Sequence, residues 1–145
     1  MVSFRGSVPH ASTEERMIDA VWQVLRFGTV GLVNTAVGLL AIYVLMYVFD
    51  TNLLIANASG YIVGLLVSFL LNRTWTFRSD QRTTVVLLRY IAAALFSYSL
   101  NFLIVLYGDM YSSVNQFFLQ IIGISFYTVS MFILCRYFVF AVRSH

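Results

Sequence analysis

The chain has 145 residues, of which 60% are hydrophobic and 10% are charged, and its formal net charge is +3. Soluble domains carry about 25% charged residues, and a chain of this length has too little interior to bury so much apolar surface. The composition excludes an ordinary soluble domain and indicates a protein that is solvated by lipid.

A short amphipathic helix is predicted before the first apolar stretch. Ser12 and Glu15 have the spacing of a capping box, and Met17, Val21 and Leu25 then share one helical face. We expect this lead-in helix (residues 12–25) to lie on the cytoplasmic surface of the membrane. There it either anchors the protein or docks a partner enzyme.

Four apolar stretches follow, each of 18 to 23 residues without a charged side chain. About 20 residues cross the hydrocarbon layer, and lipid-exposed backbone must satisfy its hydrogen bonds within a helix. The sequence therefore predicts an all-α membrane protein. Its four transmembrane helices are Phe27–Phe49, Leu53–Leu71, Tyr90–Tyr107 and Val114–Leu134.

The second pair of helices repeats the first. Segments Leu25–Phe77 and Leu88–Phe140, offset by 63 residues, share ten identities in 53 aligned positions, and the matches mark both ends of each unit. The chain is thus predicted to be a duplicated helical hairpin. A transmembrane domain at 26–140 lies between the tail with its lead-in helix (1–25) and a C-terminal tail (141–145).

The arginines predict the orientation of these helices. All nine basic residues are arginines, and each lies before the first helix, between the second and third, or after the fourth. The positive-inside rule places both termini and the central loop in the cytoplasm. Each repeat then begins and ends on the same side, so the repeats are parallel, related by an axis along the membrane normal.

The second helix carries small residues at every fourth position, which lets another helix approach closely. They either pack inside the four-helix unit or form the seam of a homodimer. The residues are Ala56, Gly60, Gly64 and Ser68.

The transmembrane stretches contain no Asp, Glu, His or Lys and no interior Arg. A proton-coupled transporter needs an ionisable group at depth, so antiport of that kind is not expected. Both histidines lie in the tails and Cys135 is the single cysteine, which argues against a metal site or a His-based catalytic group. We therefore expect no catalytic residue, no cofactor, no enzyme activity and no nucleic-acid partner.

Polar side chains at depth are neutral, and amides are the costliest of them to bury. They come from all four helices and either line a shared polar path or join helices by hydrogen bonds. These amides are Asn34, Asn57, Asn101, Gln116 and Gln120.

Four arginines form two symmetric pairs at the predicted cytoplasmic edge. Guanidinium groups bind phosphate bidentately, which favours a phosphate site, although ordinary membrane anchoring also explains them. The arginines are Arg26, Arg73, Arg89 and Arg136, and the predicted headgroup or interface residues beside them are Asn72, Trp75, Phe77 and Phe138.

The sequence resembles the GtrA-like family of small membrane proteins. The resemblance rests on Arg26-Phe27, on Val30-Gly31, on Asn34 and above all on the segment Ser68–Phe77. It implies a flippase that moves a polyprenyl-phosphate-linked sugar from the inner to the outer leaflet for cell-surface polysaccharide synthesis. Some family members have instead been proposed to recycle the lipid carrier or to recruit enzymes, so a non-transporting adaptor is the alternative.

The resemblance also implies the setting in which the protein works. We expect a multi-pass protein of the bacterial cytoplasmic (inner) membrane, in contact with membrane lipid and with a glycosyltransferase as partner; a homodimer is a further expectation. Cys135 occupies the position in the second repeat that Asn72 has in the first, which predicts that the first repeat holds the ligand more tightly.

Overall fold

A computed structural model describes residues 13–112 and 114–141, and these contain helices and no strand. Four helices are long and apolar enough to cross a membrane, which confirms the predicted all-α membrane fold. In chain order the elements are the helices α1 (Thr13–Tyr47) and α2 (Leu53–Leu71), the π-helical turn η1 (Asn72–Thr76), the helices α3 (Thr83–Tyr111) and α4 (Gln116–Leu134), and the π-helical turn η2 (Cys135–Val139).

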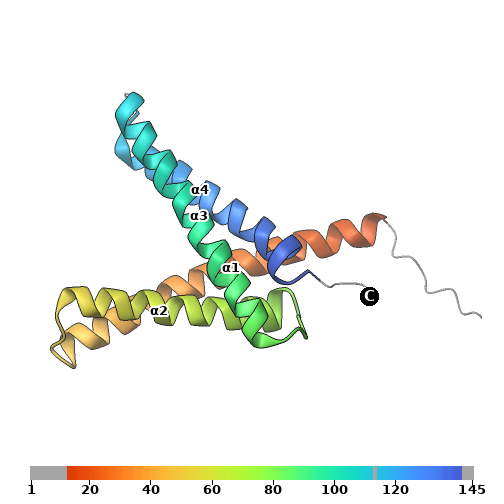
Figure 1. The fold of residues 1–145 in the computed structure, drawn as a ribbon, viewed down its shortest axis with the longest axis horizontal. Helices are drawn as coiled ribbons and strands as arrows, with labels where there is room; N and C mark the ends of the chain where they lie inside the picture. The colour runs from red at the N-terminus through yellow and green to blue at the C-terminus, as the bar shows by residue number, and fades with distance from the viewer. Residues whose placement is uncertain (1–12, 113, 142–145) are drawn as a thin grey trace, which may run out of the picture.

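The lead-in segment is helical, as predicted, but it is not a separate element. It forms the first turns of α1, which continues without a break for 35 residues and extends beyond the other helices (Figure 1). No proline separates the lead-in from the apolar stretch, so nothing stops the helix there. Ser12, the proposed cap, lies outside the described residues.

Each repeat forms a tight hairpin, α1 against α2 and α3 against α4. The second helix of each hairpin begins at an asparagine whose side chain accepts a backbone hydrogen bond. Asn52 accepts from the N–H of Ile55 at 2.9 Å, and Asn115 accepts from the N–H of Phe117 at 2.8 Å. Such caps satisfy N–H groups that a helix start leaves open, which explains why this asparagine recurs in both repeats.

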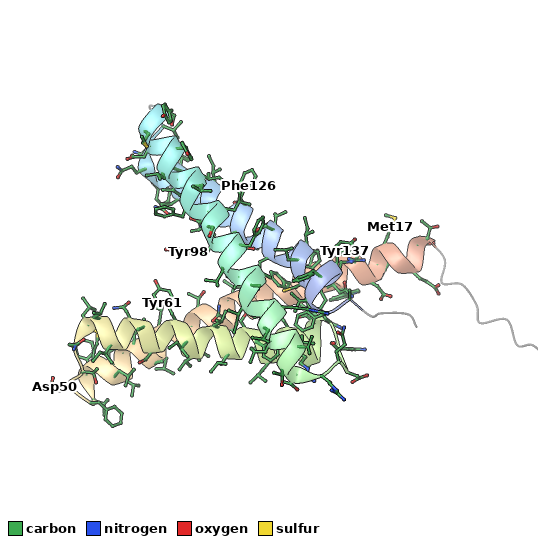
Figure 2. The ribbon with its side chains drawn as sticks, in the orientation of Figure 1. Met17, Asp50, Tyr61, Tyr98, Phe126 and Tyr137 are labelled. Atoms are coloured by element: carbon green, nitrogen blue, oxygen red, sulfur yellow. The ribbon has the colours of Figure 1, made fainter. Side chains whose placement is uncertain are left out.

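The two hairpins meet at one end and diverge toward the other (Figure 1). We call the shared end, where Arg26, Arg73, Arg89 and Arg136 lie, the arginine end. The opposite end, with the connections inside each hairpin, is the loop end. Figure 2 shows Asp50 at the tip of the first hairpin and Tyr137 near the junction of the two.

Six aromatic rings join the hairpins, and they obey the repeat. Phe77 and Phe140, equivalent residues of the two repeats, stack on each other with ring centroids 5.0 Å apart. Beside them the repeat relates two further edge-to-face contacts, at 5.4 Å and 5.3 Å. These flanking pairs are Phe27 with Phe132, and Phe69 with Tyr90. The six rings, here called the junction rings, therefore surround a local pseudo-twofold axis.

The π-helical turns bring the stacked rings into place. The N–H of Phe77 donates to the carbonyl of Asn72 at 2.8 Å, and the N–H of Phe140 donates to that of Cys135 at 2.9 Å. Each bond spans five residues, which widens the last turn of the hairpin. The similar sequences at the ends of the two repeats thus form π-helical turns, which hold the stacked rings at the junction.

Candidate functional site

A cleft of about 330 Å³ lies between the hairpins, next to the junction rings. It falls within the range of about 300–1,000 Å³ typical of small-molecule sites. All four helices and η1 contribute to its lining, and none of the described residues in that lining is charged. Its polar lining residues are Asn34, Thr35, Ser68, Asn72, Tyr90, Tyr127 and Thr128.

Three of these polar residues form a buried hydrogen-bonded trio. The Tyr90 hydroxyl donates to Ser68 Oγ at 2.8 Å. Asn72 Nδ2 donates to Ser68 Oγ at 3.3 Å and to the Tyr90 oxygen at 3.4 Å. Asn72 is 1% exposed, and its Oδ1 has no partner among the described residues. An unpaired buried acceptor costs about 1–3 kcal/mol, so the trio presents an unmet demand for a hydrogen-bond donor.

The same three positions are apolar in the other repeat. Ser68, Asn72 and Tyr90 correspond to Met131, Cys135 and Phe27 at the offset of 63 residues. These counterparts have no hydroxyl or amide group at all. The mismatch between Asn72 and Cys135 is thus one of three coupled differences, which together make a single polar site out of a symmetric junction.

We expect Tyr90→Phe to lower the free energy of unfolding by about 1 kcal/mol, because it removes a hydroxyl that both donates and accepts within the trio. Titration with SDS in mixed micelles measures the change. Tyr98→Phe is the matched control, since Tyr98 is 63% exposed and its hydroxyl makes no bond to the described residues. Equal losses of stability in the two variants would show that the hydrogen bonds of the trio do not stabilise the protein.

Two of the predicted phosphate-binding arginines occupy equivalent positions. The Arg26 guanidinium lies 5.8 Å from the Trp75 ring, and the Arg89 guanidinium lies 5.7 Å from the Phe138 ring. Arg26 Nη1 also donates to the Trp75 carbonyl at 3.4 Å. Each contact is a cation–π pair between the start of one hairpin and its own π-helical turn. Both arginines directly precede a residue that lines the cleft.

The other two arginines are not equivalent in their contacts. Arg73 Nη2 donates to the Gln81 carbonyl at 2.8 Å, and its Nη1 donates to Thr83 Oγ1 at 2.6 Å. Arg73 is therefore engaged in holding the connection to α3. Arg136 instead lies 5.6 Å from the Tyr137 ring. No two of the four arginines thus share a partner among these contacts, and they do not converge on one point through protein contacts.

The predicted interface residues divide into two groups. Trp75 and Phe138, under the arginines, are 42% and 49% exposed, as interfacial residues would be. Asn72 is buried in the trio, and Phe77 is half-buried among the junction rings. Asn72 therefore lines the cleft, and its predicted contact with a headgroup stays a prediction.

The five amides of the predicted path do not share one cavity. Asn34 lines the cleft and also a groove of about 340 Å³ along α1 and α2, which extends to Asn57. Gln116 and Gln120 line a separate hollow at the loop end of the second hairpin. Asn101 lies against Gly123 between α3 and α4. Of the five, Asn34 alone lines the cleft itself.

The stripe of small residues on α2 faces α1. All four of its residues are buried. At Gly60 an added Cβ would lie 2.8 Å from the Gly38 carbonyl oxygen, and at Gly64 it would meet Asn34. The two glycines of the stripe thus pack within the first hairpin, while Ser68 bonds Tyr90 of α3. A homodimer would need another surface.

Sequence reasoning missed Tyr90 as a site residue, together with the two threonines and Tyr127 of the cleft. One signal could have found it, because Tyr90 is the equivalent of Phe27 and adds a hydroxyl beside an arginine. For the threonines no sequence signal exists, since each is one of many hydroxyls that bond their own helix.

Comparison with known proteins adds one match. The family model described as GtrA/DPMS, transmembrane domain, matches residues 26–140. A comparison with curated proteins gives no match. The matched region contains the junction rings, the cleft and all four arginines of the arginine end.

Proposed function

Because the chain belongs to the GtrA/DPMS transmembrane-domain family, whose members are linked to the handling of lipid-linked sugars, we propose that it is a flippase. It moves a polyprenyl-phosphate-linked sugar from the inner to the outer leaflet of the bacterial cytoplasmic membrane. The observation that carries this proposal is the uncharged polar cleft between diverging hairpins, with arginines at one end. Substrate enters laterally, and its tail stays in lipid.

The energetics agree with this direction of transport. With the arginine end in the cytoplasm, the lipid phosphate carries one negative charge outward along the membrane potential. That movement is favoured by about 2.3 kcal/mol per 100 mV. The protein then requires no coupling ion, which fits four spans whose described residues carry no ionised group at depth.

Leaflet exchange in reconstituted vesicles tests the proposal. Purified protein is inserted into vesicles that contain a labelled polyprenyl-phosphate-linked sugar, and loss of label from one leaflet is followed with time. We expect exchange well above that of protein-free vesicles. If exchange stays at the protein-free rate across several sugar headgroups, the protein is not a flippase.

We expect Arg26→Gln and Arg89→Gln each to slow exchange about tenfold. A charged hydrogen bond contributes about 1.5–3 kcal/mol, and 1.4 kcal/mol corresponds to a factor of ten. Arg82→Gln is the matched control, because Arg82 is an exposed arginine of the same end whose side chain makes no capping bond. An equal loss in the control would mean that only net positive charge matters.

One observation favours a second function, recruitment of a glycosyltransferase. The first turns of α1 extend beyond the bundle (Figure 2), and their apolar side chains are exposed; Met17 is 65% and Val21 58% exposed. Replacing Met17 and Val21 with serine tests this reading in cells. If recruitment is the function, the double variant should no longer bind the partner enzyme in the membrane, while its leaflet exchange in vesicles is unchanged.

A further inference from the structure

The hydrogen-bonding groups of the cleft include both donors and acceptors. Thr35 Oγ1 donates to the Gly31 carbonyl at 3.0 Å, and Thr128 Oγ1 donates to the Ile124 carbonyl at 2.9 Å. A hydroxyl has one hydrogen, so the free lone pairs of both threonines can only accept. They face the cleft from α1 and α4.

The trio keeps one unused donor and one unused acceptor. The Tyr90 hydrogen is used toward Ser68, and the Asn72 amide hydrogens point to Ser68 and Tyr90. Two groups remain: the Ser68 hydroxyl hydrogen, which no bond in the described residues uses, and Asn72 Oδ1, a buried acceptor without a partner among the described residues. Thr35 and Thr128 therefore offer acceptors to the cleft and the buried Asn72 Oδ1 is a third, while the Ser68 hydroxyl, the Asn34 amide and the Tyr127 hydroxyl keep donors that no bond in the described residues uses.

The unused donors and acceptors of the cleft indicate which kind of ligand it binds. A phosphate has only acceptors toward these groups, and no cation lines the cleft to offset its charge. A sugar brings several hydroxyl donors together with acceptors for Asn34 and Tyr127. Apolar walls from Phe27, Leu32 and Met131 suit its C–H faces.

We propose that the cleft binds the uncharged sugar of the lipid-linked substrate by accepting hydrogen bonds from its hydroxyls, and that it excludes the phosphate. The volume of about 330 Å³ equals that of about eleven water molecules at about 30 Å³ each, which holds one monosaccharide. The phosphate then lies toward Arg26 and Arg89, whose next residues in the chain border the cleft. The inference rests on the proposed function for the identity of the lipid.

Equilibrium binding to the full-length protein in lipid nanodiscs tests the cleft. Three probes are compared: polyprenyl-phosphate glucose, the same lipid with every free sugar hydroxyl O-methylated, and polyprenyl phosphate without sugar. We expect the glucose lipid to bind at least about tenfold more tightly than the other two, which lack hydroxyl donors. Equal affinity for the glucose lipid and its methylated form would overturn the proposal.

Two variants locate the effect. Each should abolish the tenfold preference and leave binding of polyprenyl phosphate unchanged. One is the double substitution Thr35→Val with Thr128→Val. The other is Asn72→Cys, which installs the residue of the second repeat. Thr29→Val is the matched control, since Thr29 makes the same bond to its own helix, at 2.9 Å to the Leu25 carbonyl, but does not line the cleft. Retained preference in the threonine double variant would overturn the assignment, even if Asn72→Cys does not fold.

The two proposals fail separately. Sugar-selective binding without leaflet exchange in vesicles would leave the cleft assigned and remove the flippase. Leaflet exchange at the full rate with no preference among the three probes would keep the flippase and overturn the cleft as its sugar site.

Discussion

Replacing Phe140 with alanine is expected to lower the free energy of unfolding by about 3 kcal/mol. Phe140 is 4% exposed and contacts the rings of Phe69, Phe77 and Tyr90. Removing a buried phenyl ring costs about 3–5 kcal/mol in soluble cores. We take the lower value, because in lipid the loss is mainly one of packing and not of the hydrophobic effect.

SDS titration in mixed micelles measures this loss, and circular dichroism shows what remains. The helices should persist, since α1 packs on α2 and α3 on α4 without help from Phe140. Phe126→Ala is the matched control, because Phe126 is 52% exposed and joins no ring contact. Equal losses from the two substitutions would show that the junction rings do not hold the hairpins together.

The junction links stability to the proposed leaflet exchange. The hairpins meet through the junction rings and the π-helical turns, so these groups set the angle at which the hairpins diverge. The cleft lies directly beside them and shares Phe27 and Tyr90 with them. A variant with a loosened junction should therefore also lose the fixed geometry of the trio, and its leaflet exchange should fall with its stability.

The sequence predicted the duplicated hairpin because residues that recur in both repeats have the same structural role in each. Asn52 and Asn115 cap helices, and Phe77 and Phe140 stack on each other. The caps act within three residues of the chain, and the stacked rings are each other's equivalents across the junction, so both features recur in the two repeats. Length and polarity likewise predicted the four spans.

The cleft was not predictable in the same way. A helix that is apolar on all sides gives no periodic signal for the face it turns inward. Thus nothing in the sequence shows that Thr35 and Thr128 face one cavity or that Asn101 does not. The contacts of Arg73 were equally hidden, because its partners Gln81 and Thr83 lie in the connection and at the first residue of α3, and only the folded chain defines the path between them.

Substituting Gly60 with alanine should lower the free energy of unfolding by about 2–3 kcal/mol, because the added Cβ would collide with atoms of α1. The new atom would lie 2.8 Å from the backbone oxygen of Gly38 and against the Ile42 side chain. A carbonyl within a helix cannot turn aside, so α1 and α2 must separate along their seam, and overpacking of this kind costs about 1–3 kcal/mol.

The equivalent glycine of the second repeat provides the sharpest comparison. At Gly123 the nearest atoms to an added Cβ are side-chain atoms, Val105 Cγ2 at 2.9 Å and Asn101 Oδ1 at 3.2 Å. Side chains can shift, so Gly123→Ala should cost less than about 1 kcal/mol. Gly28→Ala, with open space around its Cα, should gain up to about 1 kcal/mol from helix propensity. If Gly60 and Gly123 respond alike in SDS titration, close backbone contact in the first hairpin is not what makes glycine necessary there.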